Sequence, residues 1–222
     1  MKPLAIFDMD ETVIACDSAT LWLTYLVERG FAPAEMPGIE KLMMADYHRG
    51  ALSMQSYMDY TLTPLAGRAV EMVGLWADDF VARLIPSRIY PAALKQVEWH
   101  RDQGHHLLFI SATADFIVRR IAALFGVVDV IAIDLQTRAG RYTGATEGVL
   151  SFREGKTERL KEWLRLHESS LIDSYGYSDS LNDVPLLHAV EHARVINPAS
   201  NLKQLALQHQ WQQFDWQLNE VI

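Results

Sequence analysis

Residues 4–12 read LAIFDMDET, and this stretch decides both the fold class and the chemistry to look for. Its first four residues form a short apolar run after Pro3, which predicts a buried strand. Because strand side chains alternate between two faces, Asp8 and Asp10 project to the same side. Two carboxylates there repel each other unless a cation or a proton intervenes. The stretch predicts a metal site, an ionised acid beside a protonated one, or both; the alternative is a solvated acidic loop with Thr12 as a helix cap.

Composition limits the classes of partner. The chain has 222 residues, half of them hydrophobic, and a formal net charge of -8. Because an acidic chain gains nothing from counterion release on nucleic acid, we expect no nucleic-acid partner. The chain has no Lys/Arg cluster for an anionic membrane and no apolar stretch long enough to span one. We therefore expect no membrane partner either.

Cysteine usage and the first residues bear on the compartment. Cys16 is the only cysteine, which argues against a disulfide framework and against a cysteine zinc cluster. The first three residues lead directly into the predicted strand and leave no room for a signal peptide. We therefore expect a cytoplasmic protein.

The pattern of apolar residues divides the chain into two kinds of segment. After Thr12 it predicts only helices up to residue 86, which indicates a helical insert. Helices and strands then alternate, which predicts an α/β fold with a doubly wound parallel sheet, whose ligands bind at the carboxyl ends of the strands. We expect a core domain of residues 1–15 and 87–222 and a helical cap domain of residues 16–86. The expected helices are 19–29 (capped by Ser18), 39–48, 53–61, 70–85, 90–103, 114–125, 156–166 and 201–208, and the expected strands are 106–110, 127–133, 171–177 and 193–196, with a small hairpin at 141–152.

Two polar residues occupy expected element ends. Ser111 directly follows the strand at 106–110, where its hydroxyl and the next amides would form an anion-binding nest. The alternative is a simple helix cap by Ser111 or Thr113. Lys156 opens a predicted helix, where a lysine is more often a solvated surface charge. Neither residue is decisive alone.

A second pair of acids follows a later strand. Residues 177–183 read YSDSLND and place Asp179 and Asp183 four residues apart. Asn182 or Asp183 also suits a helix cap, in place of or in addition to a chemical role. Four carboxylates in one site would require a divalent cation, and oxygen ligands select Mg²⁺ over zinc. A lysine and an amide nest beside Mg²⁺ would form a phosphate site.

Taken in order, these motifs resemble those of the haloacid dehalogenase superfamily of Mg²⁺-dependent phosphatases. Within it they resemble subfamily IB, the phosphoserine-phosphatase-like branch, in which a C1-type helical cap follows the first motif. The family pattern is D-x-D-x-T, then a strand-end Ser or Thr, then Lys, then D-x-x-x-D. The resemblance covers nearly the whole chain, and Glu11 departs from it at a position where glycine or asparagine is frequent. The matching residues are Asp8, Asp10 and Thr12, then Ser111, then Lys156, then Asp179 and Asp183.

The resemblance implies a role for each residue that touches the phosphoryl group. Asp8 would attack phosphorus and form an aspartyl-phosphate. Asp10 would protonate the leaving alcohol and then deprotonate the hydrolytic water. Ser111 and the Ala112 amide would bind phosphoryl oxygens. An acid at position 10 also argues against true dehalogenase chemistry.

The resemblance further implies a Mg²⁺ cofactor and its ligands. The metal would bind the Asp8 carboxylate, the Asp10 backbone carbonyl and Asp179. Asp183 would hold metal-bound water or orient Lys156. Lys156 and Mg²⁺ would together offset the negative charge of the nucleophile and of the phosphoryl group.

The substrate is expected to be a small-molecule phosphomonoester read by the cap. Asp17 falls where phosphoserine phosphatases have an acid for the substrate amino group, although it also suits a helix cap. Tyr60 falls near the place of their carboxylate-binding arginine, with Arg49 the nearest alternative. Phosphoserine and an amino alcohol phosphate such as histidinol phosphate are therefore comparable candidates. We expect four cap residues to line either the pocket or the core: Tyr47, Tyr57, Tyr60 and Met54.

Two other functions use the same residues. A phosphotransferase would pass the phosphoryl group to another alcohol in place of water. A non-catalytic phosphometabolite-binding protein would keep the fold, but the intact Asp8, Asp10, Lys156 and Asp179 argue against it. We expect a monomer or a homodimer.

Overall fold

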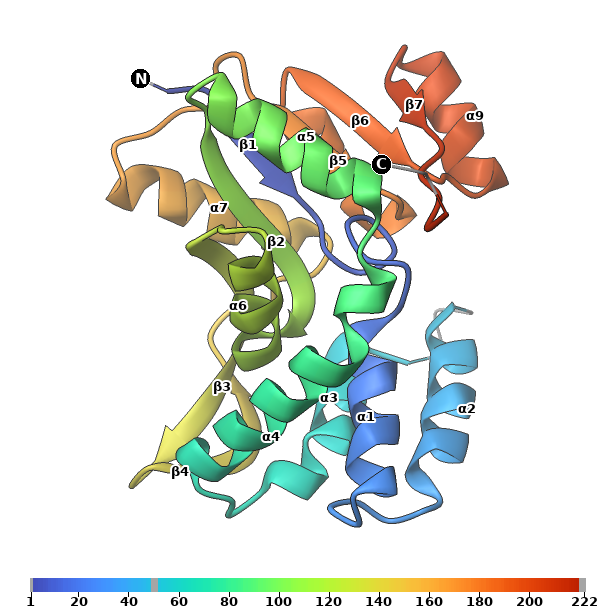
Figure 1. Cartoon of the computed structure of the whole chain (residues 1–222), viewed down its shortest axis with the longest axis vertical. Coiled ribbons are helices and arrows are strands. Elements are labelled where there is room, and N and C mark those ends of the chain that lie inside the picture. Colours follow the sequence, from blue (N-terminus) through green and yellow to red (C-terminus); the bar gives the residue numbers. More distant parts are fainter. Residues whose placement is uncertain (1, 49–51, 220–222) are drawn as a thin grey trace.

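A seven-stranded sheet forms the centre of the computed structural model, which describes residues 2–48 and 52–219, with backbone alone for 47 and 48. Its strand order is β4-β3-β2-β1-β5-β6-β7 (Figure 1). Strand β1 pairs in parallel with β2 on one side and β5 on the other. Only β4 runs antiparallel to its neighbour, so the predicted doubly wound parallel sheet is confirmed. The strands are β1 (Leu4–Phe7), β2 (His106–Ala114), β3 (Asp129–Arg138), β4 (Arg141–Glu147), β5 (Tyr175–Ser178), β6 (His192–Ile196) and β7 (Gln212–Phe214).

The alternation of side chains along β1 gives the sheet two apolar faces. Ala5 and Phe7 join one buried cluster, which includes residues of α5 and α6. Leu4 and Ile6 join the other, which includes residues of α7, α8 and α9. Because both faces are covered, β1 reads as a continuous apolar run, as is usual for a central parallel strand. These helices are α5 (Pro91–Asp102), α6 (Asp115–Leu124), α7 (Glu154–Leu166), α8 (Val184–Ala189) and α9 (Ser200–Gln208).

The described residues between 18 and 84 form the predicted run of helices, which Figure 1 shows as one group below the sheet. The chain enters and leaves this group side by side. The Ala15 amide donates to the Arg88 carbonyl (2.7 Å) and the Tyr90 amide to the Val13 carbonyl (3.2 Å). The helices are α1 (Ser18–Glu28), α2 (Met36–His48), α3 (Met54–Thr61) and α4 (Val70–Leu84), with 3-10 turns at Thr63–Leu65 and Pro86–Arg88. Among the described residues, no helix is both long and apolar enough to cross a bilayer.

The antiparallel hairpin of β3 and β4 reaches from the sheet to these helices (Figure 1). Its two-residue turn has positive φ at Ala139 (49°) and Gly140 (71°), the backbone that a tight hairpin requires. Two amides at the start of α4 and in the loop before it donate to the hairpin, from Gly67 to the Tyr142 carbonyl (2.8 Å) and from Val70 to the Gly140 carbonyl (3.0 Å). The hairpin therefore lies earlier in the chain than the predicted 141–152.

The structure differs from the sequence analysis at three local points. Ser18 does not cap α1; the Asp17 side chain does, accepting the Thr20 amide at 2.9 Å. Helix α6 begins without a side-chain cap, because β2 continues through Ser111 and Thr113 to Ala114. Strand β7 was not predicted, since its sequence is polar and only three residues long.

Candidate active site

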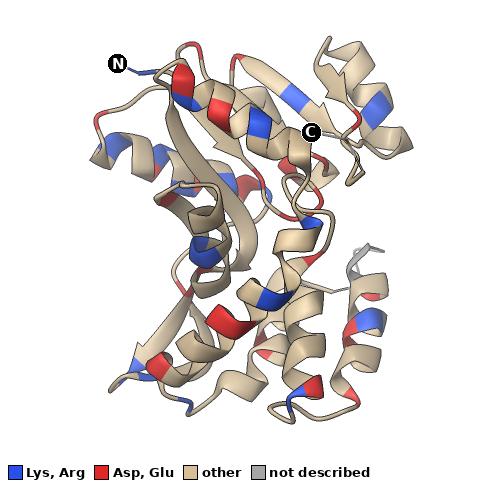
Figure 2. Cartoon of the chain, viewed as in Figure 1, with Lys and Arg blue, Asp and Glu red and all other residues tan. Residues whose placement is uncertain are grey.

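The carboxyl ends of β1, β2 and β5 meet at one cavity of about 290 Å³ between the sheet and the helical group. Parallel strands gather the residues that follow them at a single edge, which is why four distant motifs come together. In Figure 2 the loops that leave this edge carry acidic segments in red. The predicted residues that line the cavity are Asp8, Asp10, Asp17, Ser111, Ala112, Lys156, Asp179 and Asp183.

Asp8 is buried, with 6% of its surface exposed. Its Oδ1 accepts a hydrogen bond from Lys156 Nζ at 2.6 Å, and its amide donates to the Tyr177 carbonyl of β5 at 2.9 Å. Burial raises the pKa of the Asp8 carboxyl to about 6; Lys156 opposes this rise, and Asp183 adds to it. The lysine thus supplies the positive charge that keeps Asp8 ionised at neutral pH.

Lys156 is 3% exposed and also donates to Asp183 Oδ2 at 2.8 Å. Burial alone would lower the pKa of this ammonium, but Asp183 and Asp8 raise it above its usual value. The preceding residue must be glycine, because a Cβ on Gly155 would lie 2.1 Å from the Leu150 carbonyl oxygen. This close approach fixes the first turn of α7 and with it the direction of Lys156.

The Asp10 carboxyl has a different set of partners. Its Oδ1 accepts the Ser18 amide at 2.8 Å, and its Oδ2 accepts the Thr113 hydroxyl at 2.8 Å. Burial raises the pKa of Asp10 to about 7, with Asp17 adding to the rise and the Ser18 hydrogen bonds opposing it. Asp10 is therefore poised to hold or release a proton near neutral pH.

The environment of Thr12 supports a cation between Asp8 and Asp179. Its Oγ1 lies 3.1 Å from Asp8 Oδ2 and 2.9 Å from Asp179 Oδ1, and it accepts the Asp179 amide at 3.0 Å. One hydroxyl has one proton, so it donates to only one of the two carboxylates at a time. Burial raises the pKa of Asp179 well above its usual value, and the charge of Asp8 adds to this. A divalent cation bound by both acids would resolve this conflict.

Asp183 gives a second sign of a cation-binding site. Its Oδ2 accepts from Lys156 and from the Ser178 hydroxyl (2.7 Å), whereas its buried Oδ1 has no partner within the described structure. A buried carboxylate oxygen rarely stays unpaired. The three oxygen donors of Asp8, Asp179 and Asp183 therefore fit a hard cation such as Mg²⁺.

The end of β2 supplies neutral donors. The register between β2 and β3 shifts between Ile110 and Ala114, so the strand bends as it reaches the cavity. The Ser111 Oγ accepts the Thr113 amide at 3.1 Å and keeps its own proton for another acceptor. Ser111 and Thr113 thus face the site and do not cap α6.

The helical group forms the opposite wall of the cavity with Asp17, Met44, Met54 and Tyr57. Met54 and Tyr57 were predicted candidates for this lining. Tyr60, which lies one turn beyond Tyr57 on α3, is not among the residues that line the cavity. Arg49 and the side chain of Tyr47 lie outside the described residues.

Two candidate functional residues were not predicted from the sequence. Thr113 binds Asp10, and the D-x-D spacing gave no sign of it. Glu40 is a buried acid of α2 whose Oε1 accepts from Thr20 Oγ1 (2.8 Å) and from the Tyr57 hydroxyl (3.0 Å). Burial, then Asp17 and Glu40, raise the pKa of Tyr57 far above its usual value. The only sequence signal was an acid on an otherwise apolar stripe of a predicted helix.

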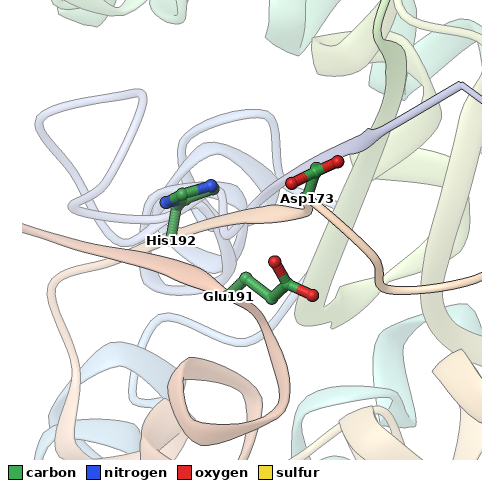
Figure 3. Close-up of side chains that lie close together, drawn as sticks. All are labelled: Asp173, Glu191 and His192. Atoms are coloured by element: carbon green, nitrogen blue, oxygen red, sulfur yellow. The ribbon is translucent and has the colours of Figure 1, made fainter.

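Another group of potential metal ligands lies elsewhere. Asp173, Glu191 and His192 have ligand atoms within 4.8 Å of one another just before β5 and at the start of β6 (Figure 3). All three side chains are exposed, so water already solvates them. A surface hollow of about 790 Å³ lies near Trp216 and lacks paired buried carboxylates among its described lining. Neither feature matches the charge arrangement around Asp8.

Comparison with known proteins decides the family. The model of haloacid dehalogenase-like hydrolases matches residues 5–188. This chain belongs to that family. The predicted membership of the haloacid dehalogenase superfamily, as a phosphoserine-phosphatase-like hydrolase, is thereby confirmed.

Three relatives are informative. A histidinol-phosphatase of Neisseria meningitidis serogroup C (strain 8013) is 36% identical over 217 residues, which cover 95% of this chain and 97% of that protein. A crystal structure of a protein of unknown function from Bordetella pertussis Tohama I superposes with a TM-score of 0.91 at 37% identity, covering 97% of this chain and 99% of the other. A substrate-bound phosphoserine phosphatase superposes with a TM-score of 0.68 at 18% identity, covering 92% and 90%, and shows the shared fold.

Proposed function

We propose that this hydrolase is a Mg²⁺-dependent phosphatase that cleaves a small phosphomonoester through an aspartyl-phosphate on Asp8. The observation that carries the proposal is the contrast between two neighbouring carboxyls. Asp8 is paired with a buried lysine, whereas Asp10 is held by the Ser18 amide and the Thr113 hydroxyl. Two carboxyls with different environments can serve as nucleophile and as acid in the same site.

In the first step an Asp8 carboxylate oxygen attacks phosphorus and the ester P–O bond breaks. The leaving alcohol takes the proton of the Asp10 carboxyl, which becomes a carboxylate. The Ser18 amide keeps Asp10 in place after it is ionised, because an N–H donor stabilises the charged form. The product is a free alcohol and a phosphorylated Asp8.

In the second step water hydrolyses the acyl phosphate. Asp10, now ionised, takes a proton from the water as the water oxygen attacks phosphorus. The bond between phosphorus and Asp8 breaks, inorganic phosphate leaves, and Asp8 returns as a carboxylate beside Lys156. Asp10 is protonated again, so the cycle balances.

Positive charge and neutral donors would hold the phosphoryl group. Ser111 and the Ala112 amide suit two of its oxygens at the end of β2, and the Lys156 charge offsets the repulsion between phosphate and Asp8. Asp8, Asp179 and Asp183, with the Asp10 backbone carbonyl, would hold Mg²⁺. When bound, the cation supplies further charge neutralisation for phosphoryl transfer.

The names of relatives support a small substrate with a nitrogen base or an amine. The relative from Neisseria is named a histidinol-phosphatase, and a structural neighbour is a phosphoserine phosphatase. Histidinol phosphate and phosphoserine are accordingly the first substrates to test.

The decisive test is acid quenching during turnover of a ³²P-labelled phosphate ester with Mg²⁺. We expect label on the protein that hydroxylamine releases, as an acyl phosphate requires. Asp8→Asn should show no label and at least a thousandfold lower kcat, since the nucleophile is lost. EDTA should abolish turnover, and Mg²⁺ should restore it in the wild type and in His192→Ala, which removes a ligand of the exposed group. Full activity of Asp8→Asn would refute the proposal.

A further inference from the structure

Behind the wall of the cavity formed by the helical group lies a buried carboxyl group without a described counter-ion. Glu40 is 2% exposed, and its two hydrogen-bond donors, Thr20 and Tyr57, are neutral hydroxyls. No ion pair of Glu40 occurs within the part of the chain that the structure describes. A carboxylate buried without an ion pair is unfavourable, because it loses its hydration without gaining a partner of opposite charge. A cation that arrives with the substrate would offset this loss.

Tyr57 connects that charge to the reaction. Its ring lines the cavity together with Met44 and Met54, and its hydroxyl donates to Glu40 Oε1 at 3.0 Å. Asp17 lines the same cavity from the N-cap position of α1. The substrate end that faces the helices therefore meets aromatic and sulfur-containing walls with negative charge beside and behind them, an arrangement that favours an organic cation.

The described lining of the cavity holds no cation for a substrate carboxylate other than Lys156. Six acidic residues line it, against one cation within the described lining, Lys156. That lysine already donates to Asp8 and Asp183. A carboxylate placed at the helical end of the cavity would meet the like charge of Asp17, with Glu40 behind Tyr57, and would be repelled.

Resting on the function proposed above, we infer that the helical group selects phosphate esters whose alcohol part carries a positive charge and no carboxylate. Asp17 would face the cation, and Glu40 would act through Tyr57 as a positioning residue. The apolar side chains of Met44 and Met54 would pack against the carbon skeleton. Amino alcohol phosphates form this class, and phosphoamino acids fall outside it.

A matched pair of substrates tests the inference directly. Phosphoethanolamine and phosphoserine differ only by a carboxylate, and p-nitrophenyl phosphate lacks both charged groups. With Mg²⁺ present, we expect kcat/KM for phosphoethanolamine to exceed that for phosphoserine at least about tenfold. The kcat/KM for histidinol phosphate should likewise exceed that for phosphoserine.

Two variants test the residues. In Glu40→Gln the ratio of kcat/KM for phosphoethanolamine to that for p-nitrophenyl phosphate should fall about 10- to 100-fold, as for the loss of a charged partner. Glu35→Gln removes an exposed acid just before α2 and should leave this ratio unchanged. If circular dichroism shows that Glu40→Gln does not fold, Asp17→Asn is the variant to test in its place, because asparagine also caps a helix.

The outcomes separate this inference from the proposed function. Hydrolysis of p-nitrophenyl phosphate with equal or better use of phosphoserine would overturn the inference alone. Loss of that phosphoserine activity in Arg49→Gln would then identify the cation that reads the carboxylate. Hydrolysis of none of the four esters would overturn the proposed function. An unchanged ratio in Glu40→Gln, with its fold intact, would refute the role of Glu40.

Discussion

At the residue scale, the chemistry of the site depends on Asp8 and Asp10 having different hydrogen-bond partners although they are only two residues apart. Asp8 and Asp10 follow the same strand, yet one meets an ammonium and the other an amide and a hydroxyl. These partners come from α7, α1 and β2, so no local pattern around residues 8–10 encodes them. The difference in protonation that the chemistry requires is therefore a property of the assembled fold.

A residue outside the site leads to a prediction about acid stability. His100 is fully buried; its Nδ1 lies 2.7 Å from His105 Nδ1, and its Nε2 lies 2.6 Å from the Tyr177 hydroxyl. Burial, then His105 and Arg194, lower the pKa of His100 to about 3. The unfolded chain takes up this proton below about pH 6.5 while the folded chain does not. This contribution to stability is complete above pH 6.5 and decreases as the pH falls toward 3.

We therefore expect His100 alone to lower the free energy of unfolding by about 2 kcal/mol between pH 7.5 and pH 5. Urea unfolding at both pH values measures it, and His100→Gln should lose that part of the pH dependence. His209→Gln removes an exposed histidine of the C-terminal part and should keep it. Equal pH dependence in wild type and His100→Gln would contradict the assignment.

At the element scale, the start of α7 leads to a prediction about catalysis. A Cβ at Gly155 would lie 2.1 Å from a backbone oxygen, so Gly155→Ala must displace either the first turn of α7 or the loop at Leu150. Lys156 would move away from Asp8, and we expect kcat to fall by at least tenfold and the protein to lose about 1–3 kcal/mol of stability. Steady-state kinetics and urea unfolding measure both effects.

A second glycine provides the control. Gly38 lies within α2, and a Cβ there meets nothing within 4 Å. Gly38→Ala should keep kcat and gain about 0.5–1 kcal/mol from helix propensity. Wild-type kcat in Gly155→Ala would show that α7 does not fix Lys156.

The elements also show how far sequence reasoning reaches. The apolar runs and glycine stops predicted the parallel strands, the run of helices and the order of the motifs, because these depend on local periodicity and the β-α alternation. The polar β7 could not be predicted, since pairing with β6 and not its own propensity makes it a strand. Glu40 and Thr113 were missed for a related reason: their partners are 17 to 103 residues away.

At the scale of the whole molecule, one apolar cluster spans the sheet and the helical group. Trp22 of α1 packs against Phe80 of α4 and against Phe116 of α6, with ring centroids 5.3 and 5.5 Å apart. Phe7 of β1 belongs to the same buried cluster. The boundary of a cap domain at residues 16–86 remains a prediction. The apolar core of these helices is shared with the rest of the chain.

This shared core predicts one cooperative unfolding transition. Far-UV circular dichroism and tryptophan fluorescence should give coincident urea curves. Trp22→Ala should shift both curves together and lower the free energy of unfolding by about 3–5 kcal/mol. Two separated transitions, with only one of them moved by Trp22→Ala, would mean that the helical group folds independently.

The hairpin of β3 and β4 has a consequence for how such enzymes diversify. It holds the loop before α4 by backbone hydrogen bonds and α3 by the contact of Gln55 with Thr146, whereas α2 packs against α1 and α3. Substitutions on α2, which carries Glu40 and Met44, can therefore change the substrate specificity without displacing the residues that hydrolyse the ester. A new substrate specificity can evolve through changes in this one helix.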